Sequence, residues 1–150
     1  MFRFRLQRVL RYRVRLEDQQ ARRVQQAAAT LQKIRGRQEL VRATMKTLAQ
    51  DGAEVRNQSP SIWLWRMQTD YLARQQTLLD ALALDEMAAQ DELRKQQQLL
   101  TRAHQDREVL ERLKAKQHRE WQQEEQRRER KQMDEVGSQR AWRHGATHLP

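Results

Sequence analysis

Residues 71–121 decide the fold, and they read YLARQQTLLDALALDEMAAQDELRKQQQLLTRAHQDREVLERLKAKQHREW, without proline or glycine. Apolar residues recur there in alternating steps of three and four, which keeps them in a narrow stripe on one side of an α-helix. A stripe of about two positions per heptad is typical of a coiled-coil seam, and it needs a partner helix to be buried. The large apolar seam residues of this stretch are Leu72, Leu79, Leu82, Leu93, Leu100 and Leu110.

The first fifty residues carry a second stripe of the same kind and supply the partner. The pattern predicts a helix over about residues 3–50, with Gly36 tolerated at a local cost of about 1 kcal/mol relative to alanine. Polar residues such as Gln20 and Gln38 occupy seam positions in the same phase. The apolar seam residues of this first helix are Leu6, Leu10, Val24, Leu31, Ile34, Val41, Met45 and Leu48.

The break between the two helices is predicted over about residues 51–61. Asp51-Gly52 is a helix-stop and turn signal, whereas Ser59-Pro60 fits an N-cap followed by proline at the first helical position. The second helix is expected over about residues 60–139, with Gly137-Ser138 as a weak point, and residues 145–150 as a tail. Two such helices joined by a short connection predict an all-α, antiparallel coiled-coil hairpin, with the second helix longer and residues 1–150 in a single domain.

The composition supports this fold class over a globular one. Of the 150 residues, 33% are charged and 5% are aromatic, and the mean hydropathy is −1.11. Disorder is the competing interpretation of so polar a chain, but disordered segments do not hold a 3/4 apolar period over this length. There is no cysteine for a disulfide or a thiolate. Since no apolar run approaches the ~20 residues of a membrane span, and the N-terminus lacks the core of a signal peptide, we expect a cytoplasmic protein.

The net charge of +10 is unevenly distributed. Residues 1–30 carry +6 and residues 31–61 carry +3, whereas residues 62–93 carry −4 and residues 94–150 carry +5. Antiparallel pairing places the basic end of the first helix beside the acidic start of the second. Exposed ion pairs contribute about 0–1 kcal/mol each, so they select the register more than they add stability. The facing groups are expected to be Arg35, Arg37, Arg42 and Lys46 on one side and Asp70, Asp80, Asp85 and Glu86 on the other.

No constellation of residues points to catalysis, a metal or a cofactor. The histidines lack the spacing of a metalloenzyme motif, and His144 and His148 lie in the expected tail. There is no glycine-rich loop for phosphate. We therefore expect neither an enzyme nor a protein that binds a small-molecule substrate.

The aromatic residues and the basic ends are the candidate binding features. Trp63, Trp65 and Tyr71 either close the end of the hairpin or face outward as interface anchors; Trp63 and Trp65 cannot both face the same helix. Trp121 and Trp142 fall where no helix of the chain is expected to cover them. The N-terminal arginines alternate with apolar residues, a pattern that favours an acidic protein surface over nucleic acid.

These residues give the chain a resemblance to the FliJ family of flagellar type III export proteins. The N-terminal run FRFRLQRVLRYRVRLEDQQAR, residues 2–22, is similar to the opening of that family. Trp65 and Tyr71-Leu72 match the aromatic start of its second helix. The run LERLKAKQHREWQQEEQRRERKQMDEVGSQR, residues 110–140, resembles its closing pattern. Arg11 departs from the family, which often has an acidic residue at that place.

The resemblance implies a non-enzymatic component of flagellum biogenesis, and so of motility and chemotaxis. Members form a coiled coil similar to the central stalk of rotary ATPases, bind and help assemble the hexameric export ATPase, contact the export gate in the membrane, and bind export chaperones. We expect this chain at the cytoplasmic face of the inner membrane, held there only through protein partners. The gate-binding residues would be Trp63, Trp65 and Tyr71. The ATPase-binding residues would be Arg3, Arg5, Arg8, Arg11, Trp121, Arg127, Arg128 and Arg130.

Two alternatives stay open at this point. The stalk protein of a virulence injectisome shares the architecture, although the FRFRLQ opening favours the flagellar system. A structural coiled coil that forms homodimers or binds nucleic acid is the more general alternative.

Overall fold

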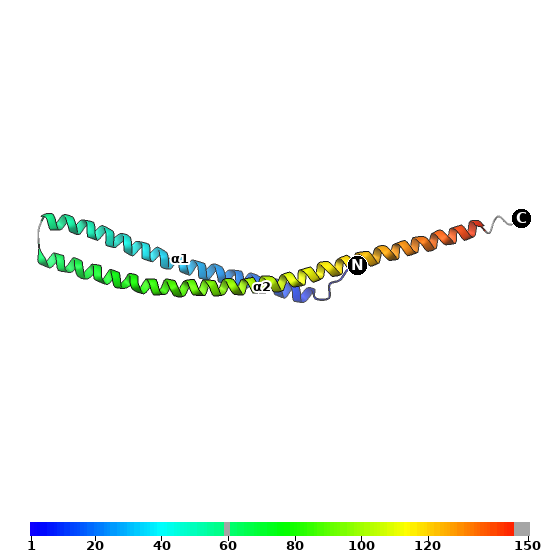
Figure 1. Cartoon of the computed structure of the whole chain (residues 1–150), viewed down its shortest axis with the longest axis horizontal. Helices are drawn as coiled ribbons and strands as arrows, with labels where there is room; N and C mark the ends of the chain where they lie inside the picture. The colour runs from blue at the N-terminus through cyan, green and yellow to red at the C-terminus, as the bar shows by residue number, and fades with distance from the viewer. Residues whose placement is uncertain (59–60, 146–150) are drawn as a thin grey trace. The chain divides into compact units, whose positions relative to one another are not determined.

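The computed structural model describes residues 1–58 and 61–145, and it describes side chains as far as Trp142. Two α-helices account for nearly all of this chain: α1, Gln7–Gln58, has 52 residues, and α2, Ile62–Gly145, has 84 (Figure 1). No strand occurs in the described residues. The predicted all-α fold, with two paired helices and a longer second helix, is confirmed.

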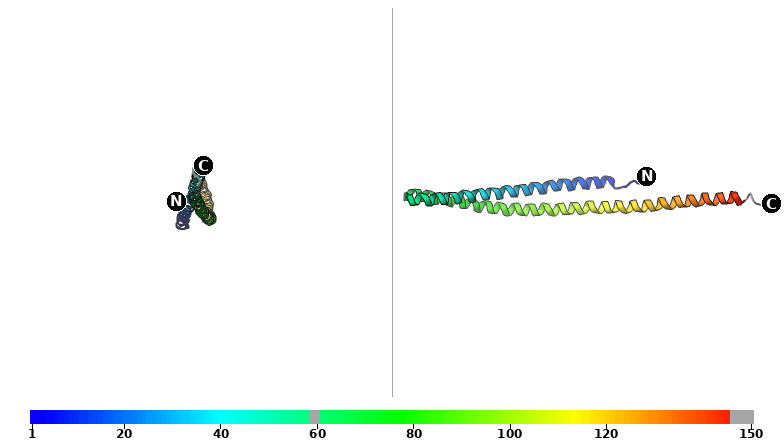
Figure 2. Two further views of the ribbon diagram at one scale, coloured as in Figure 1. Left: turned by 90° about the vertical axis from the view of Figure 1, so that its left-hand side faces the viewer. Right: turned by 90° about the horizontal axis from the view of Figure 1, so that it is seen from above.

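Contacts between residues divide the chain into two units. The central unit is Leu16–Ala103, and the terminal unit consists of Met1–Arg15 together with the chain from His104 onward. In the central unit α1 and α2 run side by side and antiparallel (Figures 1 and 2), because partner numbers on α2 fall as those on α1 rise: Gln20 bonds Gln96, Arg35 bonds Glu86, and Leu48 bonds Gln68. The single-domain organisation stays a prediction.

The core of each unit is thin and follows the 3/4 period. Leu31 and Leu82 are buried in the central unit, and Phe4 and Leu10 are buried in the terminal unit. None of the described side chains is completely enclosed, as expected for only two helices. The other seam residues between Leu10 and Leu110 are half-buried: Val24, Ile34, Val41, Met45, Leu48, Leu72, Leu79, Leu93, Leu100 and Leu110.

The N-terminus differs from the sequence-based expectation. α1 begins at Gln7 rather than near Arg3 or Phe4. The backbone amide of Gln7 donates a 3.1 Å hydrogen bond to the carbonyl of Phe4, which closes a turn before the helix. Leu6 therefore precedes the helix and leaves the seam, with 36% of its surface exposed, whereas Phe4 is only 7% exposed. Because the residues before Gln7 are not helical, the 3/4 spacing of α1 does not determine which of them is buried. Phe4 is buried there in place of Leu6.

The predicted break at Asp51-Gly52 is also wrong, because α1 continues to Gln58. A methyl group at Gly52 would collide with the side-chain amide of Gln68, which donates a 2.9 Å hydrogen bond to the carbonyl of Leu48. Gly52 thus provides space for a side chain from α2 and does not terminate α1. No described residue other than glycine has a positive φ, and neither does any described glycine.

The second helix extends further than predicted. α2 passes through Gly137-Ser138 without a break and ends at Gly145 rather than near residue 139. A single helical glycine costs about 1 kcal/mol, and the Ser138 hydroxyl donates to the carbonyl of Glu135 at 2.9 Å within the helix. The expected Ser59-Pro60 cap, most of the tail and the side chains of His144 and His148 lie outside the described residues.

Candidate partner-binding surfaces

Two polar layers interrupt the seam of the central unit and fix its register. The amide of Gln20 donates to Gln96 at both its backbone carbonyl, at 3.1 Å, and its side-chain oxygen, at 2.6 Å. Gln96 donates in turn to Glu92 at 2.6 Å. No buried side-chain nitrogen or oxygen in the described residues lacks a partner, so the layer satisfies the polar groups that it buries.

The second layer is centred on Glu86. Arg35 donates to one carboxylate oxygen of Glu86 at 2.8 Å, and Gln38 donates to the other at 3.0 Å. The hydrogen bond from Arg35 is the main cause that holds the pKa of Glu86 below its ordinary value; Gln38 and the nearby charge of Arg42 act in the same direction, against the effect of burial. Of the facing charges expected from the sequence, Arg35 and Glu86 form a direct ion pair.

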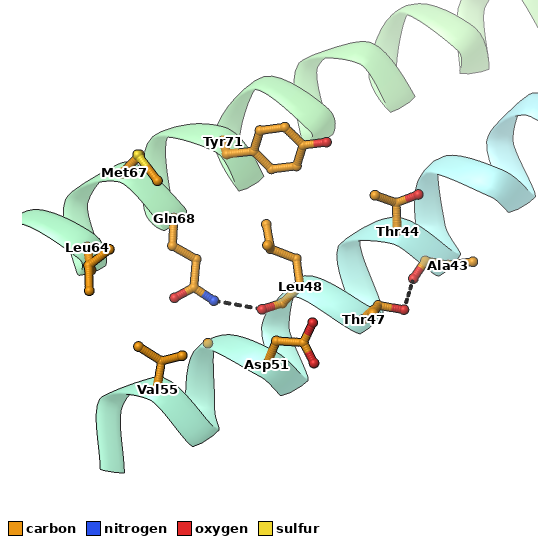
Figure 3. A pocket seen from close by; sticks show the side chains of 11 residues that line it. Ala43, Thr44, Thr47, Leu48, Asp51, Val55, Leu64, Met67, Gln68 and Tyr71 are labelled. Carbon is orange, nitrogen blue, oxygen red and sulfur yellow. Dashed lines mark hydrogen bonds between the residues drawn. The ribbon is translucent and has the colours of Figure 1, made fainter. Parts of the chain in front are cut away.

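An open groove of about 730 Å³ lies between α1 and α2 at the end of the central unit nearest the connection (Figure 3). Leu64, Met67 and Tyr71 of α2 form one side, and Leu48 and Val55 of α1 lie across from them. Four of these five side chains count among the exposed large hydrophobic residues of the protein, Leu48 being the exception. The remaining residues that line the groove are Ala43, Thr44, Thr47, Asp51, Gly52 and Gln68.

The structure does not gather the three predicted aromatic residues into one surface. Tyr71 lines the groove, whereas Trp65 lines a separate small pocket with Arg56, Ser61 and Ile62. Trp63 is 68% exposed and lines neither. All three face solvent to a substantial degree.

Sequence reasoning missed Leu64, Met67 and Leu78 as surface residues. Leu64, Tyr71 and Leu78 are spaced by seven residues, and Tyr71 and Leu78 directly precede the seam residues Leu72 and Leu79, so the three form a second apolar column beside the seam. That seven-residue spacing was the signal that could have found them. The column widens the apolar face of α2 beyond what α1 covers.

In the terminal unit, the N-terminal arginines lie on the surface. Arg3, Arg5, Arg8 and Arg11 are all exposed, and no ion pair joins any of them to the described residues. Arg13 is the exception, since it pairs with Asp106 of α2 at 3.1 Å. Arg3, Arg5, Arg8 and Arg11 thus form an arginine cluster with no ion-pair partner among the described residues.

An aromatic cluster holds this arginine-bearing segment against α2. The ring of Phe2 meets His118 edge-on, with 5.0 Å between ring centroids, and lies 6.1 Å from the ring of Trp121. Phe4, two residues after Phe2, is also buried. Trp121, for which no covering helix was expected, is therefore half-buried against a non-helical residue of the N-terminus. No pattern in the sequence identified Phe2 or Phe4 as anchors.

Beyond Trp121, α2 exposes nearly every described side chain. Arg127, Arg128 and Arg130 are all exposed, and Arg128 approaches Glu124 one turn earlier at 3.7 Å. Trp142 is 84% exposed. This part of α2 carries little apolar surface of its own, and its side chains are open to a partner.

No group of three or more metal-ligating side chains is present in the part of the chain that the structure describes. Neither described helix is apolar enough over a sufficient length to cross a bilayer.

Comparison with known proteins identifies the family. A family model described as flagellar FliJ protein matches residues 1–146 of the 150-residue chain. The chain belongs to the FliJ family. It is thus a coiled-coil protein of flagellar export, associated with components of the export apparatus, and the flagellar alternative is favoured over the injectisome. No curated protein and no solved structure matches the chain.

Proposed function

We propose that this FliJ-family chain acts without catalysing a reaction, by binding the hexameric export ATPase, promoting its assembly, and linking it to the export gate. Export chaperones are further partners, and the protein works at the cytoplasmic face of the inner membrane through these protein contacts. The observation that carries the proposal is the exposed arginine cluster of the terminal unit, which has no ion-pair partner among the described residues, in a chain that matches the family over nearly its whole length.

The arginine cluster is assigned to the ATPase. Arg3, Arg5, Arg8 and Arg11 concentrate positive charge on a segment that is anchored by Phe2 and Phe4. A held cluster of arginines binds acidic side chains at a smaller entropic cost than a free tail would, and arginine forms bidentate bonds with carboxylates. The exposed Arg127, Arg128 and Arg130 extend the basic contact along α2.

The groove of the central unit is assigned to the export gate. Its apolar lining, with Tyr71 at the side and the exposed Trp63 and Trp65 nearby, has the composition of interface anchors. Binding there depends on burial of apolar surface, so it should respond weakly to salt, whereas binding at the arginine cluster should weaken as salt rises.

ATP turnover by the purified export ATPase of the same organism, with and without this protein, tests the proposal. We expect higher turnover together with more hexamer, and we expect removal of residues 122–150 to abolish both effects. The matched control is Leu84→Ala, at a 69% exposed residue outside both surfaces, which should stimulate like the unaltered protein. Absence of binding and of stimulation would refute the proposed role.

A further inference from the structure

The apolar column Leu64, Tyr71 and Leu78, whose first two residues line the groove, is close to symmetric about Tyr71. Leu64 and Leu78 each lie seven residues from Tyr71, and the three side chains are exposed to nearly the same degree, at 37%, 39% and 39%. Residues at this spacing share one face of a helix. A surface whose residues repeat in mirrored order about one point can contact a second copy of itself across a twofold axis.

We propose that two copies of this chain associate through this face, antiparallel, with the twofold axis at Tyr71. Leu64 of each copy then packs against Leu78 of the other, and the two Tyr71 rings meet at the axis. The α1 and α2 helices of both copies form a local four-helix bundle, in which the open grooves are closed against each other. Each copy thereby covers the apolar side chains that its own two helices leave exposed.

The charges near the groove fit the same arrangement. Arg74 lies three residues after Tyr71 on α2, and Asp51 lines the groove on α1. The antiparallel axis brings Arg74 of one copy to the level of Gln68 of the other, which lines the groove together with Asp51, so that the guanidinium meets the Asp51 carboxylate. The contact occurs twice by symmetry.

Net charge favours this face over the rest of the surface for self-association. Residues 40–81 carry five basic and four acidic side chains, a net charge of +1, whereas residues 1–15 carry six arginines and no acidic residue. Two copies therefore repel each other little at the groove and strongly at the arginine cluster. An antiparallel arrangement also keeps like segments of the two chains apart.

Self-association is separate from the proposed contacts with the ATPase and the gate, but it limits when the gate can bind. The dimer covers Tyr71 and the groove, so it is a form in which the proposed gate-binding surface is closed, and dissociation opens that surface. Because the test uses the protein alone, failure of the dimer would leave gate binding untouched, and failure of gate binding would leave the dimer untouched.

Sedimentation equilibrium of the full chain over a wide concentration range tests the association. We expect the mass to rise from 18.1 kDa toward twice that value. Leu78→Gln should raise the dissociation constant by about tenfold or more, because the change acts twice in a symmetric dimer. Leu84→Gln is the matched control: Leu84 is more exposed, at 69%, but lies outside the column, so its dimer should persist. Circular dichroism verifies that both variants keep their helix content.

Disulfide formation tests the arrangement, since the chain contains no cysteine. Tyr71→Cys should link to a second copy of itself, and Leu64→Cys mixed with Leu78→Cys should give the mixed dimer. Arg74→Glu should weaken association, and the double variant Arg74→Glu with Asp51→Arg should restore it. A constant mass of 18.1 kDa at all concentrations, or equal effects of Leu78→Gln and Leu84→Gln, would overturn the proposal.

Discussion

The groove of the central unit and the arginine cluster of the terminal unit expose opposite chemistry. The groove is lined by Leu64, Met67 and Tyr71 and lies in a nearly neutral segment. The cluster presents Arg3, Arg5 and related residues with no neutralising partner in the described chain. One pair of helices thus offers two surfaces whose binding depends on different forces, apolar burial in one case and charge in the other.

The two units also differ in what holds their helices together. In the central unit, apolar seam residues alternate with satisfied polar layers at Gln20–Gln96 and Arg35–Glu86. In the terminal unit, Phe2 of a non-helical segment packs on His118 and Trp121 of α2, and Phe4 is buried. Buried polar layers specify register at some cost in stability, whereas aromatic anchors add apolar burial without fixing a helical register.

Substitutions in the seam of the central unit should destabilise the protein far more than substitutions on its surface. Leu82→Ala removes a side chain that is 4% exposed and should lower the free energy of unfolding by about 2–3 kcal/mol, through lost burial and an unfilled cavity. Leu84→Ala, at a 69% exposed position two residues away, should change it by no more than about 0.5 kcal/mol. Urea denaturation followed by circular dichroism measures both; equal losses would contradict the assigned seam.

A second substitution tests whether aromatic residues hold the terminal unit. Phe4→Ala should free the N-terminal segment, since about 2 kcal/mol of apolar burial is lost there. Amide hydrogen exchange should then accelerate in residues 1–15 and stay unchanged in residues 16–58. Tyr12→Ala, at a side chain that is 59% exposed, is the control and should leave both regions protected. Faster exchange along the whole of α1 would show that the two units are not held separately.

The Glu86 layer predicts a pH dependence of the central unit. Because the pKa of Glu86 is lower in the folded than in the unfolded chain, its contribution is fully present above the ordinary carboxyl pKa and is lost as the pH falls through the folded-state value. Glu86→Gln should therefore destabilise the protein near neutral pH and reduce the loss of stability on acidification. Glu39→Gln serves as a control at an exposed carboxylate outside both polar layers. Identical pH profiles for the protein and its Glu86→Gln variant would contradict this role.

Alanine substitutions at the two glycines of α1 should change the stability by different, small amounts. Gly36 has nothing within 4 Å of an added methyl group, so Gly36→Ala should stabilise the protein by about 0.5–1 kcal/mol through helix propensity. Gly52→Ala gains the same propensity but displaces the amide of Gln68 from the carbonyl of Leu48, so its net gain should be smaller. Thermal denaturation compares the two, and an equal gain would show that the Gln68 contact contributes nothing.

Much of the fold was predictable from the sequence because the 3/4 period and the charge asymmetry are properties of long segments. The helix pairing follows from such patterns, and the polar seam positions Gln20, Gln38 and Glu86 could be placed by phase alone. Boundaries were less predictable: Asp51-Gly52 has the sequence of a turn, and only the approach of Gln68 from the other helix explains why a glycine lies there within α1.

The candidate surfaces were predictable only in part, because exposure depends on what the partner helix covers. The arginines at 3, 5, 8 and 11 could be identified from composition. The anchoring of Phe2 on His118 and Trp121 could not, because those residues are more than a hundred positions apart and the contact lies outside any helical period. Predicting the groove would have required recognition of the second apolar column beside the seam. That column forms a surface because α1 leaves Leu64 and Met67 exposed.

The assignment of the arginine cluster to the ATPase is tested by the binding of the charge-reversed variant Arg5→Glu/Arg8→Glu/Arg11→Glu to the export ATPase and, separately, to the export gate. Each replaced arginine is exposed and unpaired in the described chain, so the fold should persist. We expect ATPase binding to fall at least about tenfold and to lose most of its salt dependence, while gate binding is unchanged. Equal loss of both interactions, or unaltered ATPase binding, would contradict the division of the molecule into a charged ATPase surface and an apolar gate surface.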